Sequence, residues 1–93
     1  MNFIVRNSAN VANKYIRFAK WKIHKMNRKY GNILYSEIYV KQASARPEVY
    51  DVTVKLGVPG PDIIVKSKSG NLRSLLSDIS AKMKRQLSSY TAK

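Results

Sequence analysis

Basic side chains provide most of the chemistry open to this 93-residue sequence. Residues 11–30 contain no acid, yet they hold seven of the eighteen Lys and Arg residues, and a second basic group follows near the C-terminus. Clustered ammonium and guanidinium groups bind phosphate oxygens, and they release counterions when they meet a polyanion. The first group comprises Lys14, Arg17, Lys20, Lys22, Lys25, Arg28 and Lys29, and the second comprises Lys82, Lys84 and Arg85.

The uneven distribution of charge favours a polyanionic partner. The formal net charge is +13, to which residues 11–30 contribute +7 and residues 82–93 contribute +4. Solvated helix surfaces usually mix Glu with Lys, because i,i+4 pairs of opposite charge stabilise a helix. Residues 11–30 have no such pair, so their cations repel one another until an outside anion arrives. The sequence therefore predicts that RNA or DNA is the partner.

Catalysis has little support in the sequence. His24 is the only histidine and there is no cysteine, which excludes a His cluster, a disulfide and a Cys-based metal site. The turn at residues 57–60 lacks the Lys and Ser of a phosphate-binding loop. We therefore expect a binding protein, not an enzyme, with no metal, cofactor or small-molecule substrate. The acids are scattered, without the paired spacing of acid–base catalysis, at Glu37, Glu48, Asp51, Asp62 and Asp78.

Length and hydropathy predict one monomeric cytoplasmic domain over residues 1–93. A chain of this size has room for a single core. No apolar run approaches the roughly 20 residues that a membrane span needs. Residues 1–6 lack the basic segment and long apolar core of a signal peptide.

Apolar periodicity predicts a strand and then a helix in the first third of the chain. Residues 3–6 are apolar and β-prone, and Ser8 or Asn10 is expected to cap a helix over residues 11–30. Gly31 and Asn32 end that helix. Its apolar face recurs at spacings of three and four, at Ala12, Tyr15, Ile16, Ala19, Ile23, Met26 and Tyr30.

Alternating polarity predicts three further strands, at residues 33–42, 50–56 and 63–68. A loop at residues 43–48 and a Gly/Pro turn at residues 57–62 separate them, and because neither is helical the strands form an antiparallel meander. In the first of these strands Leu34, Ser36, Ile38 and Val40 face one way, while Ile33, Tyr35, Glu37, Tyr39 and Lys41 face the other. In the other two, the inward residues are Val52, Val54, Leu56, Ile63 and Val65.

A second helix follows Asn71, with the second basic group near its C-terminal end. The resulting order is β-α-β-β-β-α, an α+β fold similar to double-stranded-RNA-binding domains. Both helices are expected on one face of a four-stranded sheet, with the other face open to solvent. The apolar stripe of this helix is Leu72, Leu75, Leu76, Ile79, Met83 and Leu87.

The predicted elements place the cations together. A helical projection sets Trp21 opposite the core, among the cations, where it either stacks on a base or is a rim residue shielded by lysine stems. Tyr35 and Tyr39 lie on the open sheet face, where cross-strand packing is favoured over base stacking. Because both helices cover the same face, one basic surface is expected from Lys22, Lys25, Lys29, Lys82 and Arg85.

Two segments resemble a known family, the ribosome hibernation factors, which comprise the short hibernation-promoting factor and the related ribosome-associated inhibitor. Residues 22–26, Lys-Ile-His-Lys-Met, match the family's K-x-x-K-L in the first helix. Residues 82–87, Lys-Met-Lys-Arg-Gln-Leu, match its K-L-x-R-Q-L in the second. The opening strand followed by Asn10-Val11 fits as well, and the resemblance runs essentially from end to end of the short form.

The resemblance implies a protein that binds the small subunit of idle 70S ribosomes, between the head and body of the 30S particle, in stationary phase and stress. There it covers the path of mRNA and of the A- and P-site tRNAs, so that translation stops. One departure is that Arg73 stands where the family has an aromatic residue at the start of the second helix. The implied contacts to 16S rRNA are Lys22, Lys25, Lys82 and Arg85, with Arg28 and Lys29 at the basic end of the first helix.

Two alternatives stay open from the residues. One is a double-stranded or structured RNA-binding module that is not specific to ribosomes. That class places a lysine cluster at the start of its second helix, where this chain has only Arg73. The other is a module for membrane surfaces or acidic proteins, which Trp21 disfavours because it lies on the charged face and not on the apolar one.

Overall fold

The computed structural model describes residues 2–91 and has the predicted β-α-β-β-β-α order. The predicted domain also includes Met1, Ala92 and Lys93, which lie outside the described residues. The elements are β1 (Asn2–Asn7), α1 (Asn13–Tyr30), β2 (Tyr35–Ala43), β3 (Arg46–Gly57), β4 (Ile63–Ser69) and α2 (Leu72–Thr91).

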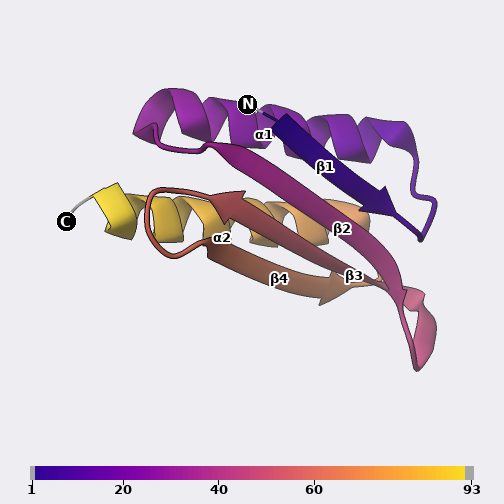
Figure 1. The fold of residues 1–93 in the computed structure, drawn as a ribbon. Helices are drawn as coiled ribbons and strands as arrows, with labels where there is room; N and C mark the ends of the chain where they lie inside the picture. Colours follow the sequence, from indigo (N-terminus) through magenta and orange to yellow (C-terminus); the bar gives the residue numbers. More distant parts are fainter. Residues whose placement is uncertain (1, 92–93) are drawn as a thin grey trace.

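The four strands form one sheet in the order β1-β2-β3-β4. β1 pairs in parallel with β2, and α1 makes the crossover that such a pair requires. β2, β3 and β4 pair antiparallel, which confirms the predicted meander. Both helices cover the same face of the sheet and run in the same direction (Figure 1).

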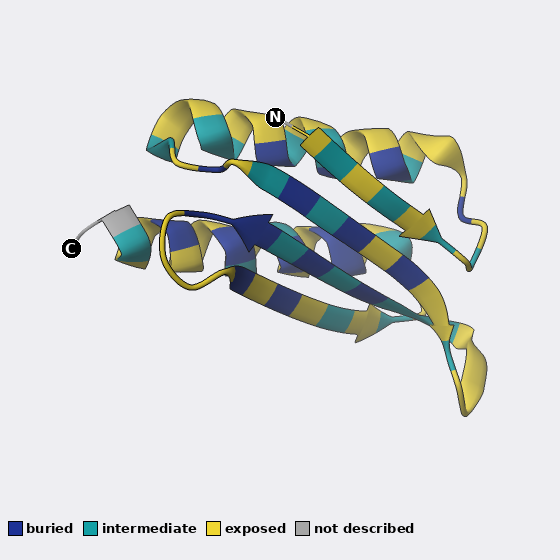
Figure 2. Cartoon of the chain, viewed as in Figure 1, coloured by how far each residue is buried: buried dark blue, intermediate teal, exposed yellow. Residues whose placement is uncertain are grey.

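The core lies between the helices and the covered face of the sheet. Val52, Val54, Leu56, Ile63 and Val65 are buried, as the alternation predicts (Figure 2). From the helices, the predicted apolar stripes supply the opposite wall. The side chains with 1% exposure or less include Ile23, Leu75, Ile79, Met83 and Leu87.

The approach to β2 reverses one prediction. Ile33 is buried, whereas Leu34 is 61% exposed, the opposite of the predicted alternation. Both residues precede the strand, which begins at Tyr35. Asn32 adopts a left-handed conformation at φ 68°, and the Ile33 amide donates to the Asn27 side chain at 3.1 Å. The period of two therefore does not apply until the strand ladder starts.

The β2–β3 connection is shorter than the predicted loop at residues 43–48. β2 continues to Ala43 and β3 begins at Arg46, so only Ser44 and Ala45 form the turn. Pro47 is tolerated in β3 because pairing with β4 starts only at Tyr50. The missing N–H of proline therefore costs no ladder bond on that side.

The two helices begin differently. Neither Ser8 nor Asn10 caps α1, because the N-cap position is Ala12, which makes no side-chain bond. Instead, the Asn7 side chain closes the preceding turn on Val11, accepting from its N–H at 3.0 Å and donating to its carbonyl at 2.9 Å. The Asn71 side chain caps α2, since its Oδ1 accepts from the amides of Arg73 and Ser74 at 3.0 and 3.2 Å.

Candidate nucleic-acid interface

The outward face of α1 carries cations that no acid among residues 2–91 neutralises. Ile16, Ala19 and Ile23 bury the opposite face of the helix. Within residues 2–91, every salt bridge lies elsewhere, on the open sheet face, at the β2–β3 hairpin or on α2. The α1 cations are therefore available to an external anion. Those fully exposed are Lys14, Arg17, Lys25, Arg28 and Lys29, and the side chains of Lys20 and Lys22 are half-buried.

An aromatic pair lies among these cations. Trp21 is 52% exposed and Phe18 is 40% exposed, with their ring centroids 6.0 Å apart. The ammonium groups of Lys22 and Lys25 stand over the Trp21 ring, at 5.6 and 4.8 Å from its centroid. Exposed cation–π contacts are worth only about 0.5–1 kcal/mol, so these lysines can exchange a ring for a phosphate at little cost. Lysine side chains thus cover part of the Trp21 ring, as expected of a shielded rim residue. The ring is also exposed enough to stack on a base.

α2 adds a different cation to this surface from the ones expected. Lys84 lies beside Lys22, Lys25 and Lys29, around a shallow pocket of about 200 Å³ that Met26 and Tyr30 also line. We call Lys22, Lys25, Lys29 and Lys84 the basic ridge. Positions 82 and 84 are about 200° apart around a helix, so only one of the two can face α1.

Lys82 and Arg85 do not join the basic ridge. The Lys82 ammonium lies 3.0 Å from the Asp78 carboxylate and donates to the Lys66 carbonyl, on the side of α2 that faces β4. The Ser67 hydroxyl, which donates to Asp78 at 2.8 Å, and then Lys82 hold the pKa of Asp78 below its ordinary value, and the charge of Arg85 adds to this effect. The cations expected to form one surface therefore lie on two sides of α2. Lys84 faces α1, whereas Lys82 and Arg85 lie on the side toward β4. α2 also continues to Thr91, so its cations lie mid-helix and not near its C-terminal end.

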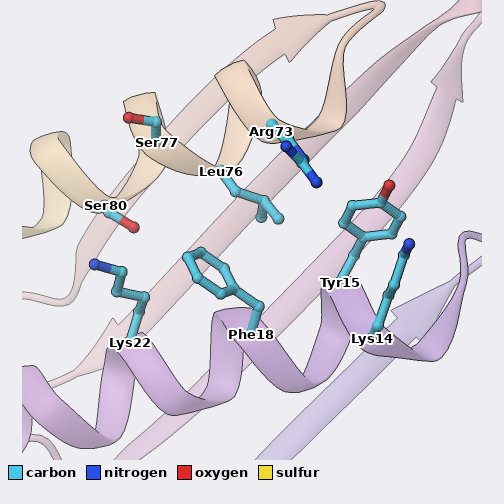
Figure 3. Close-up of a pocket in the computed structure, with 8 residues that line it drawn as sticks. All are labelled: Lys14, Tyr15, Phe18, Lys22, Arg73, Leu76, Ser77 and Ser80. Atoms are coloured by element: carbon cyan, nitrogen blue, oxygen red, sulfur yellow. The ribbon is translucent and has the colours of Figure 1, made fainter.

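A groove between α1 and α2 adjoins the basic ridge through Lys22. Its volume is about 520 Å³, and Figure 3 shows its lining side chains. Sequence reasoning did not find this groove, because its two walls are 60 residues apart in the chain. The one residue in the sequence that pointed to this region was Arg73, a charged residue at the start of the second helix where the hibernation factors have an aromatic one. The lining, called here the interhelical groove, is Lys14, Tyr15, Phe18 and Lys22 from α1 with Arg73, Leu76, Ser77 and Ser80 from α2.

The open face of the sheet has mixed charge. Three of the five acids lie there or at its edge, and each pairs with a lysine, in Lys55–Glu37, Lys55–Asp62 and Lys68–Asp51. The Tyr35 hydroxyl donates to Asp62 and the Tyr39 hydroxyl donates to Glu37, which raises the pKa of Tyr39. Both tyrosine hydroxyls thus engage acids of this face, and Tyr39 lies opposite Thr53 in the β2–β3 ladder. The two faces of the molecule therefore differ in charge. The open sheet face mixes acids and bases, whereas the α1 side of the helical face has bases and no acid.

Residues 2–91 have neither a membrane-spanning helix nor a cluster of metal ligands. Neither helix is long and apolar enough to cross a membrane. In the same range, no three His, Asp or Glu side chains gather in the way that a metal site requires.

The fold and the cationic face define a small α+β domain whose helical side suits a polyanion. No family model matches the sequence, and no curated protein matches it. Solved structures do match. A ribosomal subunit interface protein from Coxiella burnetii has a TM-score of 0.84 and 18% identity, covering 100% of both chains. The N-terminal domain of Thermus thermophilus Protein Y has a TM-score of 0.72 and 13% identity, covering 96% of this chain and 94% of that one. The chain therefore has the fold of these proteins over its full length.

Proposed function

We propose that this chain is a ribosome hibernation factor. In this proposal it binds the small ribosomal subunit in the decoding channel and blocks mRNA and the A- and P-site tRNAs. The observation that carries the proposal is the acid-free, unpaired cationic face of α1 on a fold shared with a ribosomal subunit interface protein. The motifs of residues 22–26 and 82–87 support the same conclusion.

The proposed mechanism is occupancy of the channel without chemistry. Cations at i, i+3 and i+4 on a helix lie about 5–6 Å apart, so the α1 row meets several neighbouring phosphates of 16S rRNA. Binding releases counterions, which makes the affinity steeply dependent on salt. On the open sheet face the acids pair with lysines and so reduce the number of free cations, whereas α1 has no acid, so the protein docks by its helical side. The contacts proposed are Lys22, Lys25, Arg28 and Lys29 from α1, with Lys82 and Arg85 on the far flank of α2.

The flank of α2 that carries Lys82 and Arg85 contributes less per residue than the α1 row in this proposal. Lys82 already pairs with Asp78, so a phosphate must compete with a carboxylate for it. Lys84, which lies on the basic ridge, is a further proposed contact that the motif match alone does not include. The protein acts as a monomer in the cytoplasm and needs no cofactor.

Cosedimentation with 70S ribosomes, with and without competing mRNA, tests the proposal. The variant Lys22/Lys25/Lys29/Lys84→Ala removes the basic ridge and is expected to lose binding at moderate salt. The control Arg6/Lys41/Lys66/Lys68→Ala removes the same charge from β1, β2 and β4 and keeps binding. A third variant, Lys82/Arg85→Ala, measures the share of the far flank.

Three results would overturn the proposal: equal loss in the ridge variant and the control, wild-type binding that excess mRNA does not reduce, or binding to free duplex RNA as tight as binding to ribosomes. The last result would assign the chain to the structured-RNA-binding modules that are not specific to ribosomes.

A further inference from the structure

The interhelical groove combines an apolar interior with a cationic rim, and at about 520 Å³ it is larger than the pocket of about 200 Å³ at the basic ridge. We propose that it holds one unpaired nucleotide of the bound RNA, with the base against Phe18 and the flanking phosphates at Lys14, Lys22 and Arg73. This inference rests on the proposed function and names the feature of the RNA that the protein recognises besides charge.

The shape of the groove suits a flat occupant. Phe18 projects from α1 toward Leu76 of α2, and two small residues of α2, Ser77 and Ser80, also line the groove, with the Ser80 hydroxyl turned toward α1 (Figure 3). Large side chains at those serine positions would fill the space. The volume of about 520 Å³ lies within the range of about 300–1,000 Å³ that small-molecule sites occupy. Phe18 stays 40% exposed while Leu76 beneath it is buried, so an occupant gains apolar contact that the free protein lacks.

The charge of the groove suits phosphate. Its lining has three cations and no acid. The nearest acid along α2, Asp78, lies outside the groove in a neighbouring depression that Arg73 and Ser77 also line, and it is bound to Ser67 and Lys82. Two of the rim cations now stand over aromatic rings, with the Lys14 ammonium 5.2 Å from the Tyr15 centroid and the Lys22 ammonium 5.6 Å from that of Phe18. When RNA binds, the two ammonium groups can leave the rings and contact phosphates, because the cation–π contacts are weak. A base can then lie against the ring that the ammonium group has left.

A nucleotide fits these features better than an acidic peptide. RNA-binding proteins recognise unpaired bases by stacking them on aromatic rings and by bonding their polar edges. Phe18 supplies the ring, and the hydroxyls of Ser77 and Ser80 supply partners for a base edge. Lys22 belongs to both the groove and the basic ridge, so one RNA strand can continue from the ridge into the groove. Arg73 gains a role at the groove rim that the family's aromatic residue would not supply.

The test compares two RNA hairpins that differ by a single bulged nucleotide, 2-aminopurine, whose fluorescence falls when it stacks. The wild type is expected to bind the bulged hairpin more tightly than the paired one and to quench the fluorescence of the bulged nucleotide. Phe18→Leu keeps apolar volume but removes the ring, and it should lose affinity for the bulged hairpin by up to about 5- to 150-fold, the cost of truncating one stacking ring to alanine. Its affinity for the paired hairpin stays unchanged.

Two further variants complete the test. Arg73→Gln should lower the salt slope for the bulged hairpin by about one phosphate contact. Tyr39→Leu, which removes an aromatic ring from the opposite face of the sheet, should change neither hairpin.

Several outcomes would refute the inference: equal wild-type affinity for the two hairpins, quenching that persists in Phe18→Leu, or displacement of the bulged hairpin by an acidic phenylalanine-containing peptide that needs Phe18. The last would assign the groove to a protein partner. Failure of the proposed function looks different, because the wild type would then not cosediment with ribosomes. If ribosome binding persists while the preference for the bulge is absent, only the inference fails.

Discussion

Replacing Lys22 and Lys25 together by alanine tests whether α1 binds RNA through charge. Both ammonium groups stand over Trp21, and neither takes part in the salt bridges of residues 2–91. Alanine has the highest helix propensity, so the variant keeps α1 intact. The double substitution therefore removes two cations from the interface without removing any interaction with an acid in the fold.

The expected magnitude follows from counterion release. Each phosphate contact contributes about 0.7–0.9 to the slope of log K against log salt concentration, so losing two contacts lowers the slope by about 1.4–1.8. Between 50 and 200 mM salt, a fourfold change, the advantage of the wild type over the variant then shrinks by about 7- to 12-fold. At the low end of this range, where charge dominates, the variant binds most weakly relative to the wild type.

The assay is binding to isolated 30S subunits across this range of salt. Trp21 is the only tryptophan in the chain and is 52% exposed, so its emission gives a second readout at the interface itself. The matched control is Lys41/Lys66→Ala, which removes the same charge from exposed positions on β2 and β4 that take part in none of the salt bridges of residues 2–91. The assignment of the interface to α1 is refuted if the control lowers the slope as much as Lys22/Lys25→Ala does, or if neither variant changes it.

Three further predictions concern the fold that holds this interface in place. Asn71→Ala removes the side chain that accepts from two amides at the start of α2, and should lower the free energy of unfolding in urea by about 0.5–2 kcal/mol; an unchanged midpoint would contradict this. Ile33→Ala should cost about 2–5 kcal/mol, whereas Leu34→Ala, at 61% exposure, should stay within about 0.5 kcal/mol, and thermal melts giving the reverse order would restore the simple strand alternation. The lowered pKa of Asp78 means that its carboxylate stabilises the folded state above the ordinary Asp pKa and that this contribution is lost as the pH falls through the lowered value. Asp78→Asn should therefore unfold more readily than the wild type at neutral pH but equally at strongly acid pH, and a gap in unfolding midpoint that stays constant down to pH about 2 would exclude this linkage.

The predictions that held depended on local periodicity. The apolar spacing of α1 and α2, and the alternation at Val52, Val54 and Val65, identify buried faces because each element repeats its geometry along its own axis. The predictions that failed lie where that repetition stops. At Ile33 and Leu34, the chain turns through the left-handed Asn32 before the ladder begins. The hairpin closes in two residues, Ser44 and Ala45, because Ala43 pairs with Arg46. Such pairing between strand ends sets the turn length and cannot be read from either strand alone.

The sequence was sufficient to show that α1 is a cationic helix without acids, because composition and a 3.6-residue period need no knowledge of the neighbouring elements. It could not show which cations of α2 face α1. That depends on how α2 is rotated against the sheet, and the burial of Leu75, Ile79 and Met83 fixes this rotation. With these residues inward, Lys84 turns toward α1 and Lys82 toward β4. The interhelical groove also depends on the tertiary structure. Phe18 and Arg73 line one groove only because two parallel helices pack side by side on one sheet.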